Sequence, residues 1–329
     1  MSARYDIVVP TIGRESLDTL LSSLEECGAT PGTVVIADDR PQATDRLAAA
    51  TRESSLRIDV VSSGGNGPAA ARNAGLRRTS APWVVFLDDD VVVGEAWHDD
   101  LVRDLEAANA NPDERIGAVQ AAIRVPLPQH RRPTDWERNV ARLADASWIT
   151  ADLAVRREVL EQVGEFDESF RRAYREDSDF ALRMIAAGWR LVNGQRVTIH
   201  PVRHSTFWTS VHAQRGNADD QLLLAKHGAN FRDMLAEPPS ILPQHVVTTI
   251  ALAVAFIPRR WRVVRRAAIA LWSIATLRFT WLRLRSGPWT PDEVVRMTAT
   301  SIVIPPTATW WSLYGRRLVR ANDRAGVDS

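Results

Sequence analysis

The chain has 329 residues, of which 45% are hydrophobic and 25% are charged, and this balance excludes wholesale disorder. The formal net charge is only +1, and no proline-free apolar run reaches the roughly 18 residues of a simple membrane span. A single cysteine, Cys27, excludes an internal disulfide, and the first residues lack the apolar core of a secretion signal. We therefore expect a protein of a reducing compartment that is not secreted.

Charge is distributed unevenly along the chain. Residues 1–239 carry 28 basic and 36 acidic side chains, whereas residues 240–329 carry 13 basic and 4 acidic ones. The basic part also holds six of the 12 tryptophans: Trp261, Trp272, Trp281, Trp289, Trp310 and Trp311. Arginine together with tryptophan is typical of a membrane interface, and the basic part contains no nucleic-acid-binding motif. We therefore expect it to contact a membrane surface and expect no nucleic-acid partner.

Short apolar runs alternate with helical periodicity in the first part of the chain. The apolar runs predict strands at residues 5–10, 33–37, 56–62, 83–87 and 117–123. Helical patterns predict helices at residues 17–24, 69–77 and 96–108. This alternation predicts an α/β fold with a mostly parallel central sheet flanked by helices. Ligands of such sheets bind beyond the carboxyl ends of the strands.

The pattern is less regular after residue 123. Residues 124–146 are rich in arginine and proline and predict a long loop. An extended segment is expected at 147–155, helices at 156–163 and 176–187, and a short strand at 197–199. Apolar segments follow at 246–257, 267–277 and 298–315, the last of them broken by Pro305 and Pro306.

Three carboxylates, Asp88, Asp89 and Asp90, follow the strand predicted at 83–87. Three such groups repel one another unless a cation lies between them, and oxygen ligands suit Mg²⁺ and Mn²⁺. The alternative is a solvated acidic turn that caps the next helix. The sequence leaves both interpretations open.

A glycine-rich segment, residues 64–67, precedes Pro68 and the helix predicted at 69–77. Free backbone amides at a helix start attract phosphate, and Arg72 on the first turns could donate to two phosphate oxygens. The alternative is a plain turn with Arg72 at the surface, since the spacing matches neither the dinucleotide fingerprint nor the P-loop.

Acidic residues also open the helix predicted at 176–187, where the helix dipole alone would favour them. The functional interpretation is a general base that takes a proton from a substrate hydroxyl. Asp177 and Asp179 leave one helical turn in different directions, so we expect only one of them to serve, and composition does not choose between them. His200 and His204 follow the strand at 197–199 and are either structural or complete a carboxylate metal site.

Taken in their order, these segments resemble family 2 glycosyltransferases, which have the GT-A fold. The resemblance runs from about Asp6 to Asn217 and is carried by Val8-Val9-Pro10-Thr11, Ile36-Ala37-Asp38-Asp39, Gly67 with Ala71-Arg72-Asn73-Ala74-Gly75, Phe86-Leu87-Asp88-Asp89-Asp90, Val163-Gly164-Glu165-Phe166-Asp167-Glu168 and Glu176-Asp177. It implies an inverting, metal-dependent enzyme that moves one sugar from a nucleotide-diphosphate sugar to an acceptor hydroxyl, with Mg²⁺ or Mn²⁺ as cofactor.

The resemblance also implies roles for individual residues. On the donor side, the nucleotide base would be contacted by Thr11, Asp38 and Asp39, and the ribose or diphosphate by Arg72 and Asp88. The metal would be bound by Asp90 and Asp88, with His204 as a late ligand and His200 as its substitute. On the acceptor side, Asp177 would be the base, accompanied by Glu176, Asp179 and Trp148.

Two departures from the family pattern bear on specificity. Asp38-Asp39 is followed by Arg40-Pro41, where many members have glycine and serine, so Arg40 could reach the base or the phosphate. The Gln-x-x-Arg-Trp signature of processive members is absent, and we therefore expect one sugar to be added per encounter.

The sequence predicts three parts: a GT-A domain at 1–217, a connector at 218–243 and a basic helical region at 244–329. The apolar segments of the last part are too short to span a bilayer, so we expect in-plane or re-entrant helices at the membrane interface. A helical subdomain packed on the catalytic part, or an oligomer interface, is the alternative. The membrane interpretation places the protein at the cytoplasmic face of the cell membrane, with a lipid-linked or cell-envelope glycan as acceptor.

Three other functions compete with sugar transfer. A scaffold that only binds a nucleotide sugar or glycan would need no base such as Asp177. A nucleotidyltransferase would share the sheet and the metal but usually has a glycine-rich loop after its first strand, which is missing here. A dehydrogenase is disfavoured because the fingerprint spacing is absent.

Overall fold

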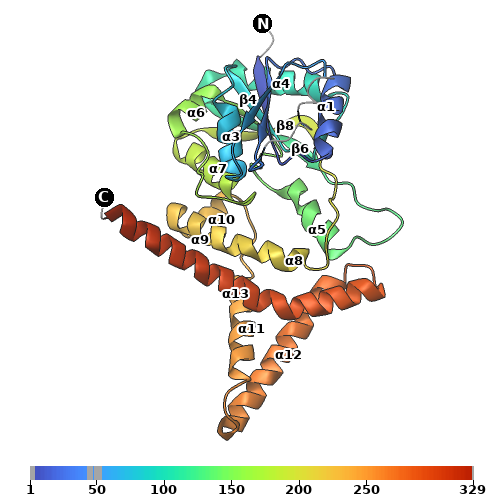
Figure 1. Cartoon of the computed structure of the whole chain (residues 1–329), viewed down its shortest axis with the longest axis vertical. Coiled ribbons are helices and arrows are strands. Elements are labelled where there is room, and N and C mark those ends of the chain that lie inside the picture. The colour runs from blue at the N-terminus through green and yellow to red at the C-terminus, as the bar shows by residue number, and fades with distance from the viewer. Residues whose placement is uncertain (1–3, 43–46, 48–53, 328–329) are drawn as a thin grey trace. The chain divides into compact units, whose positions relative to one another are not determined.

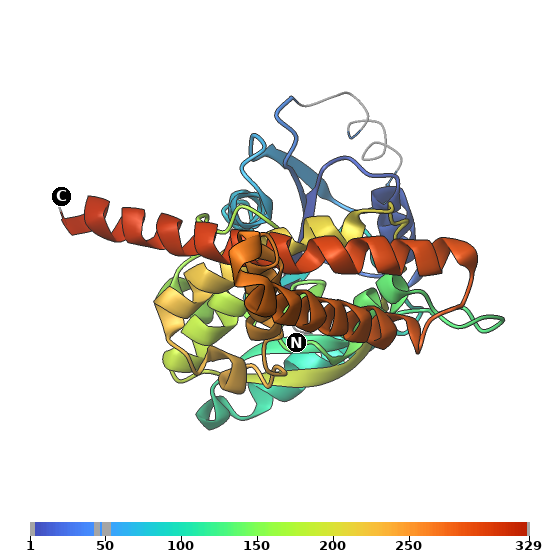
Figure 2. The ribbon, with the colours of Figure 1, turned by 90° about the horizontal axis from the view of Figure 1, so that it is seen from below.

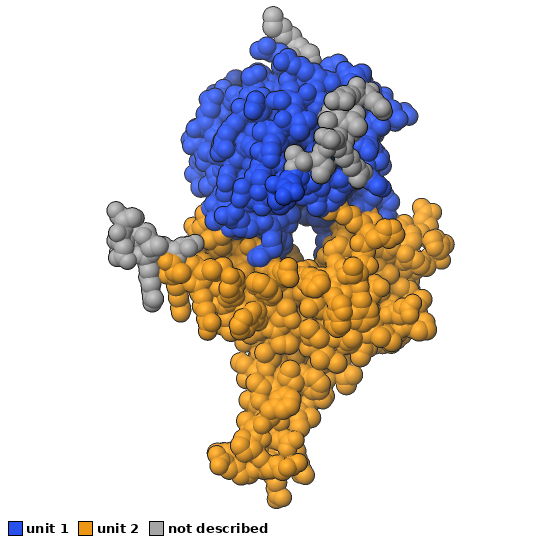
Figure 3. Space-filling view, viewed as in Figure 1, with its two compact units in different colours: residues 1–126, 141–201 blue, residues 127–140, 202–329 orange. Residues whose placement is uncertain are grey.

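The structure is a computed structural model that describes residues 4–42, 47 and 54–327. Its contacts divide the chain into two compact units (Figure 3). The first unit comprises residues 1–126 and 141–201, and the second comprises residues 127–140 and 202–329. The predicted domains at 1–217, 218–243 and 244–329 stay a prediction.

The first unit is built on one mixed sheet. Its described strands are β1 (Tyr5–Thr11), β2 (Val34–Asp38), β3 (Ile58–Ser62), β4 (Trp83–Leu87), β5 (Val92–Val93), β6 (Ile116–Arg124), β7 (Asp152–Arg156) and β8 (Arg190–Ile199). They lie in the order β3-β2-β1-β4-β7-β6-β8-β5. β7 is antiparallel to β4 and β6, and β5 is antiparallel to β8, whereas the other neighbours pair in parallel. The predicted mostly parallel α/β sheet is confirmed.

Helices cover both faces of this sheet (Figure 1). On one face lie α1 (Ser16–Glu26) and α4 (Trp97–Ala110), whose leucines pack in a buried cluster with every second residue of β1, β2 and β4. On the other face lie α3 (Pro68–Leu76), α6 (Arg157–Val163) and α7 (Glu176–Ala186). Phe86, Phe166 and Phe180 stack on this second face, with ring centroids 5.1 and 4.4 Å apart. These contacts fix α7 against the strand that ends at the acidic cluster.

The loop predicted at 124–146 contains two helical segments, so that prediction is wrong. They are α5 (Asp135–Ala141) and η2 (Arg142–Asp145). The start of α5 is a capping box, because the backbone N–H of Thr134 donates to Glu137 Oε2 at 2.7 Å and the backbone N–H of Glu137 donates to Thr134 Oγ1 at 3.3 Å. The signal was present in the sequence as threonine followed by glutamate three residues later.

The second unit is helical, which confirms the predicted C-terminal helical region. Its segments after residue 202 are α8 (Thr209–His212), η3 (Ala213–Arg215), α9 (Gly216–His227), α10 (Phe231–Met234), α11 (Leu242–Val254), η4 (Arg259–Trp261), α12 (Arg262–Leu284) and α13 (Pro291–Val327). α11 and α12 are joined at one end, and both contact α13 (Figures 1 and 2). In the described part of the chain, no helix combines the length and apolar character that crossing a membrane requires.

The predicted break at Pro305 and Pro306 is also wrong, because α13 continues through both prolines. A proline in a helix interior costs about 3 kcal/mol, since it removes a hydrogen bond and its ring clashes with the preceding turn. α13 packs against α9, α11 and α12, and this burial offsets the cost.

A buried polar cluster holds the second unit together. Arg283 on α12 donates to Asp135 Oδ2 at 2.7 Å, to Thr300 Oγ1 at 2.8 Å and to Ser301 Oγ at 3.1 Å. His245 on α11 lies within the same unit, 5% exposed, with its ring 5.0 Å from that of Phe279. Burial lowers the pKa of His245 to about 4, and the charge of Arg283 adds to this effect.

The buried His245 predicts a pH dependence of stability. The unfolded chain binds a proton near the ordinary histidine pKa of about 6.5, whereas the folded chain resists protonation down to about 4. The free energy of unfolding therefore falls as the pH drops below about 6.5, by roughly 2 kcal/mol between pH 7 and pH 5 from this group. Urea unfolding at both pH values should show this loss in the wild type and a correspondingly smaller one in His245→Gln. Equal losses in the two proteins would contradict the assignment.

Candidate functional site

The candidate site lies at the edge of the sheet where the parallel strands end. Thr11 and Asp38 are the last residues of β1 and β2, Asp88 follows β4, and His200 follows β8. Because these strands run in the same direction, their carboxyl ends meet at one edge. These residues therefore lie at the carboxyl ends of the strands, where the sequence patterns predicted a ligand site.

Asp90 and His200 come together through β5, a two-residue strand that the sequence analysis missed. β4 and β8 are separated in the sheet by β7 and β6. The chain leaves β4, passes through the three aspartates and pairs with β8, with Val92 opposite Ile199 and Val93 opposite Thr198. The β-branched run Val91-Val92-Val93 was the available signal for this strand.

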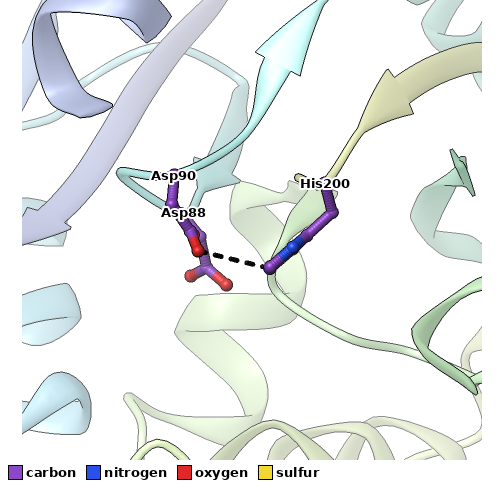
Figure 4. Close-up of side chains that lie close together, drawn as sticks. All are labelled: Asp88, Asp90 and His200. Carbon is purple, nitrogen blue, oxygen red and sulfur yellow. Dashed lines mark ion pairs between the residues drawn. The ribbon is translucent and has the colours of Figure 1, made fainter. Parts of the chain in front are cut away.

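Asp88, Asp90 and His200 form a compact cluster (Figure 4). Each offers one ligand atom, and these atoms all lie within 4.8 Å of one another. His200 Nε2 lies 3.6 Å from Asp90 Oδ2. The Asp90 side chain is buried, whereas that of Asp88 is 30% exposed. The cluster is therefore open to an incoming ligand on the side of Asp88.

The donor set of this cluster fits a divalent cation. His200 Nδ1 lies 3.2 Å from the carbonyl oxygen of Pro201, and Nε2 faces Asp90. In the tautomer with the proton on Nδ1, this contact is a hydrogen bond to the carbonyl and the Nε2 lone pair is directed toward the carboxylates. A histidine that donates its other ring N–H to a carbonyl is the usual arrangement of a metal ligand. The two carboxylates suit Mg²⁺ or Mn²⁺, and the imidazole nitrogen suits the transition metal Mn²⁺ better than Mg²⁺.

Asp89, the middle aspartate, turns away from this cluster. It accepts hydrogen bonds from Thr11 Oγ1 at 2.6 Å and from an Arg14 guanidinium nitrogen at 2.7 Å. Thr11 in turn accepts the backbone N–H of Gly13 at 3.0 Å. Asp89 therefore fixes the turn after β1. The same hydrogen bond holds Thr11 beside the three aspartates.

Arg72 links the Asp88–Asp90–His200 cluster to α7. Its guanidinium donates to Asp88 Oδ1 and to Glu176 Oε1, each at 2.9 Å, and its side chain is only 3% exposed. The guanidinium also lies 5.7 Å from the centre of the Phe166 ring. Arg72 is thus a buried bridge between two carboxylates, and the alternative of a surface arginine is wrong.

The neighbouring Asn73 holds the turn that precedes α7. Its side chain accepts the backbone N–H of Phe166 at 2.9 Å and donates to the carbonyl oxygen of the same residue at 2.9 Å. It also donates to Glu168 Oε1 at 3.0 Å. The Ala-Arg-Asn segment thus supplies one residue that contacts Asp88 and one that holds the turn before α7.

α7 begins with Glu176 and Asp177, and the carboxyl groups of both residues are poorly solvated. Burial raises the pKa of Glu176 to about 8, Asp177 adds to the rise, and Arg72 opposes it. Burial also raises the pKa of Asp177, while Arg72 and the backbone N–H of Ser178 oppose this rise. Raised carboxyl pKa values are typical of groups that exchange protons with a substrate.

The structure separates Asp177 from Asp179. Asp179 is fully buried, and its Oδ2 accepts a hydrogen bond from Arg183 Nε at 2.9 Å. Arg183 also donates to the carbonyl oxygens of Val163 and Glu165, so this pair ties α7 to the preceding turn. Asp177 is partly exposed and accepts the backbone N–H of Ser178 at 2.7 Å. Exposure therefore favours Asp177 as the group that meets a substrate.

Asp38 and Asp39 both accept hydrogen bonds from other residues of the chain. Asp38 binds the Arg40 guanidinium at 2.7 and 2.8 Å; burial raises the pKa of Asp38, but Arg40 outweighs this effect and holds it below the ordinary value. Asp39 accepts hydrogen bonds from Ser63 Oγ at 2.7 Å and from the backbone N–H of Gly67 at 2.9 Å. Asp39 therefore shapes the glycine-rich loop, and the predicted contacts of both residues with a nucleotide base stay predictions.

Gly67 is required by its surroundings. Its φ is +97°, and a Cβ atom would lie 2.6 Å from the carbonyl oxygen of Arg171. Both the left-handed backbone and this close approach exclude a larger residue.

His204 and Trp148 are the remaining predicted site residues, and neither belongs to the cluster. His204 belongs to the second unit, so its metal role stays a prediction, and His200 occupies the histidine position in the cluster. Trp148 is half-buried in the segment before β7 and has a φ of +63°, which is uncommon for a residue with a side chain. Its place on the acceptor side stays a prediction.

A buried charged network beneath β8 was not predicted. Arg196, which is fully buried, donates to Asp152 Oδ1 at 2.9 Å and to Asp104 Oδ2 at 3.0 Å. Asp152 Oδ2 also accepts hydrogen bonds from Trp97 Nε1 at 2.7 Å and from Thr198 Oγ1 at 2.5 Å. The network fixes the end of β8, which directly precedes His200. A single arginine within a strand pattern gave no sign of it.

Removing Arg196 should destabilise the first unit strongly. Arg196→Met would leave two buried carboxylates without a counter-charge, at a cost of about 3 kcal/mol or more. Urea unfolding should show this loss, whereas Arg190→Met, which breaks an exposed pair with Glu114, should change the free energy of unfolding by less than about 1 kcal/mol. Similar effects of the two substitutions would contradict the account of the network.

Comparison with known protein families finds a match in the N-terminal half of the chain. The model of the glycosyl transferase family 2 matches residues 6–164. The chain carries a glycosyl transferase family 2 domain. Of the site residues, Arg72, Asp88 and Asp90 lie inside the matched range of this family 2 domain, whereas Glu176, Asp177 and His200 follow it.

Two named relatives match only part of this chain and a smaller part of their own length. Validoxylamine A glucosyltransferase from Streptomyces hygroscopicus subsp. limoneus is 36% identical over 111 residues, which is 32% of this chain and 24% of the relative. Pre-mycofactocin glycosyltransferase from Mycobacterium tuberculosis is 32% identical over 139 residues, which is 38% of this chain and 28% of the relative. The chain thus spans about a quarter of the length of these relatives.

Two solved structures are similar to the chain at low sequence identity. A crystal structure of TarS from S. aureus matches with a TM-score of 0.42 and 16% identity, covering 84% of this chain and 55% of that one. A crystal structure of GalNAc-T7 with UDP, GalNAc and Mn²⁺ matches with a TM-score of 0.48 and 16% identity, covering 71% of this chain and 55% of that one.

Proposed function

We propose that the protein is a metal-dependent glycosyltransferase that moves one sugar from a nucleotide-diphosphate sugar to a hydroxyl group of an acceptor. The family 2 domain supports the reaction class. The observation that carries the proposal is the Asp88–Asp90–His200 cluster, which Arg72 connects directly to the acidic start of α7. The cluster that could hold a cation and a poorly solvated carboxylate lie at the same edge of the sheet, which suits displacement of a diphosphate by a hydroxyl.

Asp88, Asp90 and His200 would hold Mg²⁺ or Mn²⁺. When bound there, the cation would supply positive charge that stabilises the diphosphate as it leaves. Arg72 is buried between Asp88 and Glu176 and keeps both carboxylates in place. Its contact with the ribose or diphosphate stays a prediction. Glu176 anchors the other side of this guanidinium and thereby fixes the first turn of α7.

Asp177 would act as the general base. In the reaction the acceptor oxygen forms a bond to the anomeric carbon, the bond from that carbon to the diphosphate oxygen breaks, and the hydroxyl proton passes to Asp177. The raised pKa of Asp177 increases its affinity for this proton. Attack on the face opposite the leaving group inverts the anomeric centre, and no covalent intermediate forms.

We place the acceptor on a lipid-linked or cell-envelope glycan and the protein at the cytoplasmic face of the cell membrane. The support is the composition of the second unit, in which residues 238–291 contain no aspartate or glutamate. Such a segment suits a negatively charged surface.

Release of nucleoside diphosphate tests the proposed reaction. The full chain is incubated with a panel of nucleotide sugars and Mn²⁺, with envelope lipid extract as acceptor source. Release from one donor that depends on both acceptor and metal is the expected result. Donor binding without release would instead indicate a scaffold, and release of pyrophosphate from a nucleoside triphosphate would indicate a nucleotidyltransferase.

A further inference from the structure

One face of α12 is apolar and exposed along most of the helix. The residues of this face, here named the α12 stripe, are Val263, Ala267, Ala270, Ile274, Leu277 and Trp281. Their spacing alternates between four and three residues, which keeps them on one side of a helix. Val263, Leu277 and Ile274 are 75%, 69% and 65% exposed. A soluble surface rarely leaves so many large apolar side chains together in water.

The opposite side of α12 is buried against other residues of the second unit. Ala268, Thr276, Thr280, Arg283 and Leu284 are buried within the second unit. The α12 stripe is therefore not the core-facing side of the helix, and packing within the described part of this unit does not explain it. At a rise of about 1.5 Å per residue, the stripe is roughly 27 Å long.

Charges beside the α12 stripe have a single sign. Arg266, Arg278 and Arg285 are exposed and flank the stripe on the helix surface. Residues 238–291 contain eight arginines and no acidic residue. An apolar stripe flanked by arginines is complementary to a surface with negative charge outside and hydrocarbon beneath it. We propose that the α12 stripe binds an anionic lipid bilayer, with α12 lying in the plane of the interface.

A second copy of the chain is a poorer occupant for this face. Alternating spacings of three and four residues also occur in coiled coils, where charged residues beside the seam pair across it. Two α12 stripes brought together would oppose arginine with arginine, and the segment has no carboxylate to neutralise them. A bilayer surface that contains phosphatidylglycerol supplies the missing negative charge.

The arginines also restrict the orientation in which the α11–α12 hairpin can bind the bilayer. Entry with the joined end first would carry Arg259, Arg260, Arg262, Arg265 and Arg266 into hydrocarbon, where each charge is strongly disfavoured. α11 has 13 residues and is about 20 Å long, too short to carry these charges across a core of about 30 Å. Lying flat buries the stripe and leaves the arginines at the headgroups.

Vesicle co-sedimentation of the full chain tests the proposal, which does not depend on the transfer reaction. Vesicles of phosphatidylcholine with phosphatidylglycerol should bind the protein at low salt, and pure phosphatidylcholine vesicles should bind at least about tenfold more weakly. Leu277→Glu should weaken binding to the anionic vesicles by about tenfold or more. Because Leu277 is exposed, this change should leave the melting temperature unaltered.

The matched control is Leu313→Glu, which makes the same change at a half-exposed leucine of α13. It should bind anionic vesicles like the wild type. Equal binding by Leu277→Glu and the wild type would overturn the proposal. So would a wild-type dimer in analytical ultracentrifugation that Leu277→Glu dissociates, combined with no binding to vesicles, because the stripe would then be a contact between copies.

Discussion

Replacing Asp177 with asparagine is expected to lower the rate of sugar transfer by about a thousandfold or more while changing donor affinity less than about threefold. The amide cannot accept the proton of the acceptor hydroxyl, but it keeps the size and hydrogen-bonding geometry of the carboxylate. Steady-state release of nucleoside diphosphate gives the rate, and equilibrium titration with the donor gives the affinity.

The control for this variant is Asp113→Asn, the same chemical change at an exposed residue before β6, at the other edge of the sheet. It should transfer sugar at the wild-type rate. The rate of the wild type should rise with pH as Asp177 loses its proton, and burial places this rise above the ordinary aspartate range. Full activity in Asp177→Asn would assign the base to another group.

Replacing Asp90 with asparagine should abolish metal-dependent transfer, with a loss of about a hundredfold or more. The substitution removes one negative charge from a cluster in which three ligand atoms lie within 4.8 Å. Titration of transfer activity with Mn²⁺ should show a saturating response in the wild type and a weak one in Asp90→Asn. Addition of a chelator should abolish the transfer activity of the wild type, and addition of excess Mn²⁺ should restore that activity.

The same titration distinguishes His200 from His204. His200→Ala should weaken the response to Mn²⁺, because Nε2 of His200 faces Asp90 at 3.6 Å. His204→Ala should leave the response unchanged if His200 is the ligand. The opposite pattern would return the metal role to His204.

Many of the strands and helices of the first unit could be predicted from local sequence patterns. The strands that end at Thr11 and Asp38, and the strand that precedes Asp88, are runs of buried apolar residues, which strand periodicity detects. Their carboxyl ends meet because parallel strands share a direction, so the acidic residues could be placed at one edge from the sequence alone. The family 2 resemblance, confirmed by the domain match, added the order of the motifs.

Other features depend on contacts between distant segments. The meeting of Asp90 with His200 requires β5 to pair with β8, and the bridge through Arg72 requires α7 to pack beside α3. The network around Arg196 joins residues 44 and 92 positions apart, which no local spacing encodes. α13 continues through two prolines because its neighbours hold it. In each case tertiary packing decides what local preference leaves open or opposes.

The most direct test of the account is the thermal unfolding of the chain with nucleoside diphosphates and Mn²⁺. A ligand that binds only the native state raises the unfolding midpoint. We expect one nucleoside diphosphate to raise it only when Mn²⁺ is present, with the rise lost in Asp90→Asn and kept in Asp113→Asn. A well-folded wild type that responds to no nucleoside diphosphate, or a rise that persists in Asp90→Asn, would contradict a donor site built on Asp88, Asp90 and His200.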